Sequence, residues 1–423
     1  MKNVSERAVV LLIAAVQFVN ILEFMMVMPL GPDFAKDLGI GLSHLGVIGG
    51  SYTAAAAISG LVASTFIERF DRRKALAFAM GGLVCATIIG GFAFNLTSLL
   101  CARVLAGMFG GPATSLSLAI VADTIPPERR GKAMSIVMMA FSVASIFGLP
   151  VGLELARIGS WRSPFFAVAG LGIVIAGFAL FKLPSLTVHL QRAAERRAGG
   201  GKDGNLRDML GRPVVWVSYT LVMFAMGGMF MIVPNLSAYI QGNMAYPRAD
   251  MGILYLVGGL ASFAIMRPIG WLTDKYGSFS VGTFGSVTLI AIIYVGFVNP
   301  PVGISVLAIF TAFMMSSSFR NIPFQTLTSQ VPRPHERARF MSIQSAVQHM
   351  SAAAGAFLSS ELLSEGANHE LIGMPTVATL SMIFTATMPF TLYYVQKAVR
   401  RERAALMPSP SAAPLAPAQA ILE

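Results

Sequence analysis

The chain has 423 residues, of which 55% are hydrophobic and only 12% are charged, whereas about 25% of an ordinary soluble domain is charged. This composition excludes a soluble globular protein and indicates a membrane protein with several apolar spans. The net charge of +11 does not indicate a nucleic-acid partner, because the basic residues fall in short clusters between apolar runs. Cys85 and Cys101 both lie inside apolar runs, so no disulfide framework is expected.

Twelve runs are long enough to cross the roughly 30 Å of hydrocarbon in a bilayer. They predict an all-α membrane protein with twelve transmembrane helices in two sets of six. The first run is too long for a signal-peptide core and is expected to stay as the first span. The first set covers residues 8–30, 44–66, 74–95, 98–121, 133–156 and 163–183, and the second covers 214–240, 250–271, 279–298, 301–329, 339–362 and 371–397.

The chain is accordingly divided into four parts. Residues 1–183 form an N-terminal six-helix half, and residues 214–397 form a C-terminal one. Between them, residues 184–213 are polar and basic and contain three consecutive glycines, which predicts a flexible or amphipathic linker. Residues 398–423, rich in Ala, Pro and Ser, are predicted to form a disordered tail.

The basic residues give the orientation. The side that holds the N-terminus, the linker and the C-terminus carries 24 Lys and Arg, against 4 on the other side. Because Lys and Arg are retained on the cytoplasmic side, both termini and the linker are predicted to be cytoplasmic. The expected location is the inner, cytoplasmic membrane, with the protein as a monomer in the lipid bilayer.

The two halves repeat in sequence. An offset of 206 residues places Gly46 on Gly252 and Glu68 on Asp274. An offset of six spans makes this a parallel repeat about an axis along the membrane normal, an arrangement associated with alternating access to a site near the midplane.

Glu23 is a carboxylate inside the first apolar run, about seven residues or roughly 10 Å from its outer end. A charge in hydrocarbon costs on the order of 3 kcal/mol or more, so such residues normally face a bundle interior or a water-filled cavity. An apolar setting disfavours the charged carboxylate, which would let Glu23 take up and release a proton near neutral pH. The alternative is a structural carboxylate paired permanently with an arginine or a hydroxyl. Asn20 and Met26, from the same stretch, are candidate substrate contacts.

Four segments resemble motifs of the major facilitator superfamily, and the resemblance covers the chain apart from its tail. Gly270-Trp-Leu-Thr-Asp274-Lys275-Tyr-Gly277, after the eighth span, resembles the family's loop motif, whereas the matching Ser64 to Arg73 lacks its glycines and has Glu for Asp. Leu99-x-x-x-Arg103-x-x-Ala106-Gly107 is similar to the buried-arginine motif of proton-coupled members, and Gly148-Leu-Pro150-Val-Gly152 to the antiporter motif of the arabinose-efflux and multidrug branch.

The resemblance implies roles for these residues. Arg103 would lie at the height of Glu23 beside a central cavity and pair with it in proton coupling; the alternative is that Arg103 caps helix-end carbonyls and holds the N-terminal half together. The loop residues would latch the two halves on the cytoplasmic side, and the Gly-Pro segment would let helices approach closely and bend. These gating candidates are Glu68, Arg69, Arg72, Asp274, Gly148, Pro150 and Gly152.

Arg320 lies near mid-depth in the tenth span, and its counterpart in the repeat is Ala113, so the scaffold does not require it. An unrepeated charge at this depth indicates a role in binding a substrate or a counter-ion rather than a structural role. Asn321 and Gln325 either extend that polar surface or bond to each other.

The eleventh span adds further polar candidates. Gln344 and Gln348 are four residues apart and share a helix face, where they line a pore or bond across helices. The neighbouring His349 is more often a packed histidine than a proton carrier. Methionine clusters in the first, seventh and tenth spans favour an apolar or amphiphilic substrate, with plain core filling as the alternative.

The sequence thus predicts a secondary active transporter that exports a small apolar or amphiphilic compound in exchange for protons. The chain contains neither a phosphate-binding loop nor a zinc motif, so no enzyme activity, cofactor or metal is expected, and the proton gradient supplies the energy. One alternative is a facilitator or proton symporter that imports a solute such as a sugar. Another, of a different class, is a non-transporting membrane receptor or scaffold.

Overall fold

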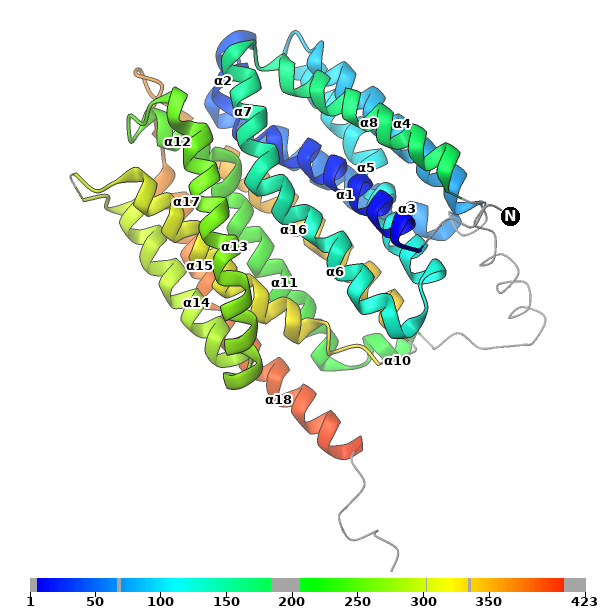
Figure 1. The fold of residues 1–423 in the computed structure, drawn as a ribbon. Coiled ribbons are helices and arrows are strands. Elements are labelled where there is room, and N and C mark those ends of the chain that lie inside the picture. Colours follow the sequence, from blue (N-terminus) through cyan, green and yellow to red (C-terminus); the bar gives the residue numbers. More distant parts are fainter. Residues whose placement is uncertain (1–5, 67–69, 184–205, 302, 334–335, 407–423) are drawn as a thin grey trace, which may run out of the picture.

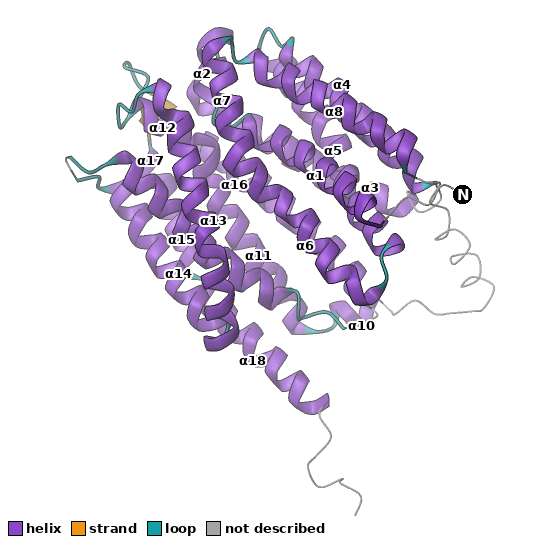
Figure 2. Ribbon diagram, viewed as in Figure 1, coloured by secondary structure: helices purple, strands orange, loops and turns teal. Residues whose placement is uncertain are grey.

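The computed structural model describes residues 6–66, 70–183, 206–301, 303–333 and 336–406. These residues are almost entirely helical, and the long helices lie side by side in one bundle (Figures 1 and 2). The prediction of an all-α protein is therefore confirmed. The exception is a pair of two-residue strands, β1 (Ser364–Glu365) and β2 (Leu371–Ile372), which form a small hairpin between two helices.

The helices before residue 184 form the N-terminal half as defined here. They are α1 (Glu6–Met26), α2 (Gly31–Leu38), the 3-10 turn η1 (Leu42–His44), α3 (Leu45–Phe66), α4 (Arg72–Gly91), α5 (Leu96–Thr124), α6 (Pro127–Val143), the π-helical segment η3 (Ala144–Gly148), α7 (Leu149–Ile158) and α8 (Arg162–Lys182).

The helices after residue 205 form the C-terminal half. They are α10 (Leu206–Leu210), α11 (Pro213–Ile232), η4 (Val233–Asn235), α12 (Leu236–Gly242), η5 (Arg248–Asp250), α13 (Met251–Tyr276), α14 (Ser278–Ile293), the π-helical η6 (Tyr294–Val298), α15 (Val306–Thr328), α16 (Arg337–Leu362), α17 (Met374–Ala386) and α18 (Met388–Leu406).

Local signals in the sequence set several helix starts. Asp71 caps α4 by accepting from the backbone N–H of Arg73. Asn95 and Ser98 form a reciprocal capping box at the start of α5. Such caps satisfy backbone N–H groups that have no partner within the helix. In the last predicted span, Pro389 cannot continue a helix from the preceding turn, and the span is divided into α17 and α18.

Ten helical segments of the described chain are long and apolar enough to cross a membrane. The two other predicted spans are α15 and α16, which are 23 and 26 residues long but more polar. Each carries candidate site residues, among them Arg320 in α15 and Gln344 in α16. The polar candidates are thus part of the reason that these two helices fall short of the apolarity of the other ten.

The helix boundaries repeat between the halves. The ends of α1 and α11, at Met26 and Ile232, are 206 residues apart, and so are the starts of α3 and α13, at Leu45 and Met251. The starts of α4 and α14 keep the same separation. The offset seen in the sequence is therefore an offset of structure.

Two predicted boundaries need correction. The predicted linker contains the short helix α10, in which Met209 is buried. The predicted disordered tail is helical up to Leu406, because Val399 is buried in the core and Glu402 accepts hydrogen bonds from Arg212. Linker residues 184–205 and tail residues 407–423 lie outside the described residues.

The two halves meet mainly at the end of the bundle that carries α2 and α12, named here the α2 end; the opposite end carries α10 (Figure 1). A Cβ on Gly46 of α3 would come within 2.2 Å of the carbonyl oxygen of Ala356 on α16. Arg248 is paired with Asp33 of α2, with 2.5 Å between Nη2 and Oδ2. The α2 end is therefore closed.

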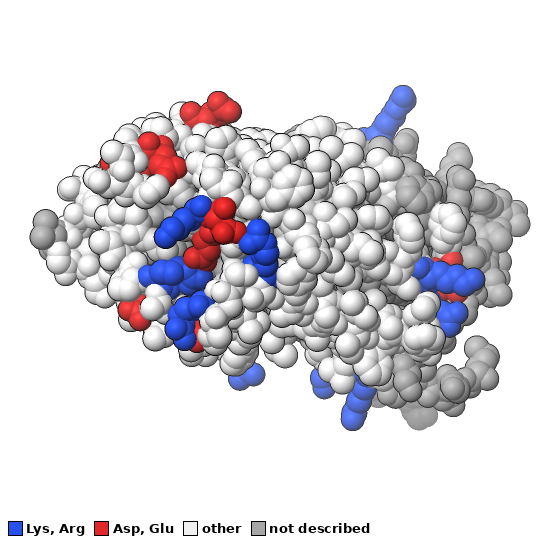
Figure 3. Space-filling view, turned by 90° about the horizontal axis from the view of Figure 1, so that it is seen from above, with Lys and Arg blue, Asp and Glu red and all other residues white. Residues whose placement is uncertain are grey.

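The outer surface suits a bilayer. Figure 3 shows charged side chains gathered in a few places on an otherwise uncharged surface. Large apolar side chains are exposed, and Phe181 reaches 82%. Contiguous exposed apolar surface of this extent is unfavourable in water. The protein is therefore embedded in the membrane through several spans.

Candidate functional site

One face of α1 is polar although it is buried. Gln17, Asn20 and Glu23 follow one another at intervals of three residues, which places them on one side of the helix. All three are at most 4% exposed. A buried polar side chain needs partners, so this face identifies a polar site inside the N-terminal half.

Glu23 pairs with Arg103 of α5. The distance between Oε1 of Glu23 and Nη1 of Arg103 is 2.5 Å, and each side chain is 1% exposed. The structure thus brings together the two residues whose depths suggested a pair. The pair is only partly satisfied, because Oε2 of Glu23 and both Nε and Nη2 of Arg103 have no hydrogen-bond partner among the described residues.

Tyr52 of α3 joins the pair to Asn20. Its hydroxyl donates to Oδ1 of Asn20 at 3.1 Å, and the guanidinium of Arg103 lies 4.7 Å from the centre of its ring. Asn20 in turn donates to the hydroxyl of Thr114 and to the carbonyl oxygen of Gly110. Three helices therefore hold one connected polar network.

Small residues make this network possible. A Cβ on Gly107 would lie 2.2 Å from the carbonyl oxygen of Tyr52, and one on Gly111 would lie 2.5 Å from that of Ala56. Only glycine allows the backbones of α3 and α5 to approach this closely. Gly107 and Gly111 therefore act as packing glycines.

The network also contacts the other half. Phe24, next to Glu23 on α1, stacks on Tyr52 with ring centres 5.0 Å apart. On its other side it stacks on Phe230 of α11, at 6.0 Å. Phe24 therefore connects Tyr52 to the interface between the halves.

Among the described residues, the C-terminal half has no equivalent pair. Gly228 and Met229, which lie 205 and 206 positions after Glu23, are both uncharged, and the carbonyl oxygen of Gly228 accepts from the hydroxyl of Ser381 on α17. The counterpart of Arg103 is Ile309, a buried apolar residue. The repeated scaffold therefore folds without this charge pair.

Arg320 of α15 is also 1% exposed. Its Nε and Nη2 donate to Oδ1 of its own neighbour Asn321, at 3.2 and 3.0 Å. No carboxylate pairs with it among the described residues. Asn321 is half-buried, and Gln325, one turn further along, is exposed.

The other substrate candidates are less closely grouped. Met26 is buried in the apolar core. Gln344 is buried and its Oε1 has no partner, whereas Gln348 is exposed and His349 is half-buried. No described hydrogen bond joins these side chains to Arg320 or to Glu23.

The gating candidates are distributed as follows. Glu68 and Arg69 lie outside the described residues. Arg72 is paired with Asp123 of α5 at 2.8 Å, within its own half. Asp274 is exposed at the end of α13. The described contacts of Arg72 stabilise the N-terminal half rather than joining it to the other half.

The Gly-Pro segment lies in the π-helical turn and the start of α7. A Cβ on Gly148 would meet Leu22 of α1 at 2.7 Å, so this glycine does permit a close approach. A Cβ on Gly152 would lie 4.0 Å from Pro164, an ordinary van der Waals contact, so no close approach requires this glycine. The carbonyl oxygen of Pro150 lies 3.8 Å from the Cβ position of Gly252 on α13. The segment therefore separates α1 from α13 at the interface.

Sequence reasoning missed Tyr52 and Thr114 of the network, and Gln17 on the same buried face of α1. Gln17 had a signal, since it continues the three-residue spacing of Asn20 and Glu23. Tyr52 and Thr114 had none, because a tyrosine or a threonine within a span is common and only the packing of α3, α5 and α1 brings them to Asn20.

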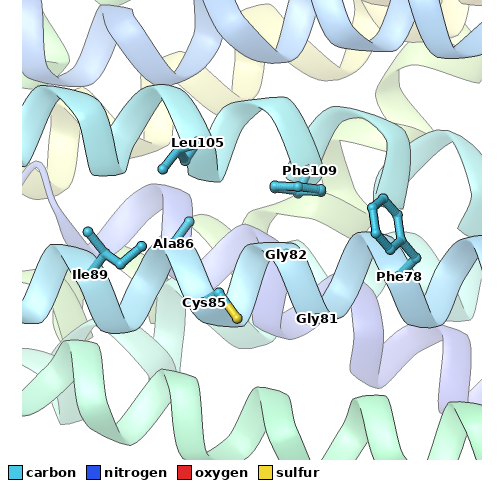
Figure 4. A pocket seen from close by; sticks show the side chains of 8 residues that line it. All are labelled: Phe78, Gly81, Gly82, Cys85, Ala86, Ile89, Leu105 and Phe109. Carbon is cyan, nitrogen blue, oxygen red and sulfur yellow. The ribbon is translucent and has the colours of Figure 1, made fainter.

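An open surface groove lies apart from this network. It has a volume of about 420 Å³, lies between α4 and α5, and is lined by apolar side chains such as Phe78, Ile89 and Phe109 (Figure 4). Because Phe78 and Ile89 are exposed, the groove belongs to the outer, lipid-facing surface.

A bundle of membrane-spanning helices in two repeated halves, with a charged site buried in one of them, defines a polytopic membrane transporter rather than an enzyme. The chain belongs to the major facilitator superfamily, whose family model matches residues 13–356.

Curated relatives are about a quarter identical to it over the segments that align. It is 27% identical over 261 residues to the purine ribonucleoside efflux pump NepI of Escherichia coli. The aligned segment covers 59% of this chain and 62% of NepI. It is 24% identical over 333 residues to the uncharacterised MFS-type transporter YbcL of Bacillus subtilis. This alignment covers 77% of this chain and 80% of YbcL. The match to NepI thus spans less than two thirds of that pump.

Solved structures share the fold. The D-xylose–proton symporter superposes with a TM-score of 0.71 at 16% identity, covering 91% of this chain and 97% of the symporter. A bacterial homologue of the human lysosomal transporter Spinster, in an inward-facing and occupied conformation, superposes with a TM-score of 0.66 at 15% identity. The superposition covers 94% of this chain and 96% of the homologue.

Proposed function

We propose that this transporter exports a small apolar or amphiphilic organic compound in exchange for protons, with Glu23 as the proton site. The observation that carries the proposal is the buried pair of Glu23 and Arg103, which the other half lacks. Taking two charges out of water can cost more than their attraction returns. Since Gly228 and Ile309 fill the matching places without charge, the pair serves something other than the fold.

The polar atoms of the pair that lack hydrogen-bond partners suggest how protonation acts on it. Oε2 of Glu23 has no partner, so a proton can bind there without displacing one. The neutral carboxyl would hold Arg103 less strongly, because a charge-assisted hydrogen bond is roughly twice as strong as a neutral one. Arg103 would then keep its contact with the ring of Tyr52.

The change can pass from this site to the interface. Tyr52 lies on α3, two residues after Gly50, whose Cβ position is 2.7 Å from Phe357 of α16. α3 and α16 form the principal contact between the halves. Loss of the charge on Glu23 would therefore bias the packing of α3 against α16 and with it the closure of the α2 end.

The proposed orientation comes from the charge count, and the proposed direction from a relative. From the Lys and Arg count, we place the α2 end outside and both termini in the cytoplasm, in the inner membrane. The efflux activity of NepI supports export. The protein acts as a monomer without a cofactor and uses the proton gradient.

The test uses inside-out membrane vesicles that are acidified by respiration and a pH-sensitive dye that reports the gradient. Compounds that the purified protein binds are added in turn. In the wild type we expect at least one compound to dissipate the gradient as it enters, and we expect Glu23→Gln to abolish this. Glu154→Gln is the matched control, because Glu154 is an exposed carboxylate paired with Arg157 on α7.

Two results would count against this function. Gradient-driven uptake that persists in Glu23→Gln would remove Glu23 from the coupling. Uptake without proton movement, or proton movement in the same direction as the solute, would favour the alternative of a facilitator or an importing symporter.

A further inference from the structure

Arg320 is an uncompensated charge in the interior of the C-terminal half. It is about 21 Å from the start of α15 and about 12 Å from its end, at 1.5 Å per residue. The charges of Glu23 and Arg103 cancel each other, whereas the described hydrogen bonds of Arg320 go to the neutral side chain of Asn321.

The helices around α15 offer no countercharge. α15 packs against α13, α14, α11 and α18. Helices α11 and α14 contain neither Asp nor Glu. Asp274 of α13 is exposed near the end of its helix. Glu402 of α18 is already bonded to Arg212. No described carboxylate on these helices is placed to neutralise Arg320.

A buried guanidinium without a countercharge is unfavourable unless a partner is supplied. The guanidinium is also the side chain best suited to a carboxylate or a phosphate, which it binds through two parallel hydrogen bonds. The missing partner therefore has the chemistry of a compact organic anion.

The surroundings of Arg320 define the rest of the ligand. Ser317, one turn earlier, places its hydroxyl 3.9 Å from the sulfur of Met229 on α11. Thioether side chains adapt to varied apolar shapes. Asn321 and Gln325 share a face of α15 that runs from the buried guanidinium to an exposed amide. Polar side chains therefore follow α15 from Arg320 towards the end of the helix at Thr328.

We propose that Arg320 is the anion-binding residue of this transporter, and that its substrate is an amphiphilic monoanion whose carboxylate or phosphate group pairs with Arg320 while its apolar body lies beside Met229 of α11. The proposal rests on the proposed transport function and narrows its substrate class.

The experiment measures binding to the purified full chain in lipid nanodiscs by its thermal unfolding temperature, since a ligand of the folded state raises that temperature. The probes are pairs that differ in charge alone: benzoate with benzamide, 2-naphthoate with 2-naphthamide, and octanoate with octanamide. We expect at least one carboxylate, and not its amide, to raise the unfolding temperature of the wild type.

Variants assign the effect to Arg320. Arg320→Gln is expected to weaken binding of the active carboxylate by about tenfold to a hundredfold, and Arg320→Lys to weaken it less. Arg267→Gln is the matched control, because Arg267 is an exposed arginine of α13, and it should bind as the wild type does.

Three results would overturn the proposal. They are the absence of any carboxylate effect in the wild type, equal effects of a carboxylate and its amide, and undiminished binding in Arg320→Gln. A further variant needs no ligand: Arg320→Met removes the uncompensated charge and should unfold at or above the wild-type temperature. A marked fall in that temperature would mean that the protein itself compensates Arg320.

These measurements are made at equilibrium without a gradient, so they are independent of the proton coupling of Glu23. Carboxylate binding in a protein whose Glu23→Gln variant still couples to protons would refute the proposed coupling and keep the anion site. Proton-coupled transport of neutral compounds alone would refute the anion site and keep the proposed coupling.

Discussion

Nη1 of Arg103 lies 2.5 Å from Oε1 of Glu23, inside a half of the protein in which neither side chain is more than 1% exposed. The two residues are 80 positions apart in the chain. The glycines of α5 allow α3 to approach until Tyr52 covers the guanidinium of Arg103. Two testable predictions concern this pair and its network, and three concern the contacts between the halves at the α2 end.

The first concerns the energetics of the pair. Arg103→Met leaves Glu23 buried without a countercharge and should lower the free energy of unfolding by about 3–5 kcal/mol. The double variant Glu23→Met/Arg103→Met removes both charges and should be less destabilised than Arg103→Met alone. Chemical unfolding in detergent measures both values. A double variant that is less stable than the single one would show that the pair itself stabilises the fold.

The second concerns Tyr52. Tyr52→Phe removes the hydrogen bond to Asn20 and should cost about 1 kcal/mol of stability. Tyr52→Leu also removes the aromatic contact with Arg103 and should cost about 1–2 kcal/mol more. Tyr294→Phe, at an exposed tyrosine, is the control and should change stability by less than about 0.5 kcal/mol. Equal effects of Tyr52→Phe and Tyr294→Phe would contradict the network.

The third concerns the closure of the α2 end. A methyl group on Gly46 would collide with the carbonyl oxygen of Ala356, so Gly46→Ala should shift the protein towards separation of the halves at this end. Gly60, on the same helix, has open space at its Cβ position, and Gly60→Ala should leave the distance unchanged. Spin labels at the exposed positions Lys36 and Glu361 measure it, in a background without Cys85 and Cys101.

The fourth tests whether this end must open during transport. Asp33 and Arg248 join the halves, so oxidation of Asp33→Cys/Arg248→Cys should abolish transport, and a reducing agent should restore it. The control is Asp37→Cys/Arg162→Cys, which replaces an ion pair within the N-terminal half. Transport that continues through the interhalf cross-link would exclude alternating access through the α2 end.

The fifth is a pH dependence at the same end. Oε1 of Glu365, in the hairpin of the C-terminal half, lies 2.5 Å from Nδ1 of His369, and Oε2 accepts from the backbone N–H of Leu42 in the N-terminal half at 2.8 Å. The hydrogen bond with His369, and then that from Leu42, lowers the pKa of Glu365 below its ordinary value of 4.5.

Because this pKa is lowered in the closed structure, the charged carboxylate stabilises closure fully above pH 4.5, and the contribution is lost as the pH falls through the lowered value. The distance between labels at Lys36 and Glu361 should therefore increase in acid. Glu365→Gln should remove that dependence. A distance that changes with pH equally in the variant would assign the effect to another group.

Much of the fold was predictable because membrane spans obey simple rules of length and apolarity. The repeat was visible in pairs such as Gly46 and Gly252, and the helix starts at Leu45 and Met251 keep the same spacing. The end of the last helix was not predictable from composition, since Glu402 is ordered by Arg212, a residue 190 positions away.

The candidate site was predictable only in part. Glu23, Arg103 and Arg320 stand out because a charge in an apolar run is costly wherever it lies. Tyr52 and Thr114 do not stand out, because their polar groups are inexpensive at many positions in a span. Their part in the network depends on which helix packs against which.

The sequence by itself therefore determined that this is an all-helical membrane transporter built from two repeated halves, and it marked the charged residues that such a protein has reason to keep. Only the tertiary structure decided which charges are neutralised. Glu23 and Arg103 compensate each other because Gly107 and Gly111 bring α5 against α3 beside α1, whereas Arg320 lies among helices that supply no carboxylate to it within the described chain. Apolarity and length are properties of single segments, but the neutralisation of a buried charge depends on contacts between segments that are far apart in the chain.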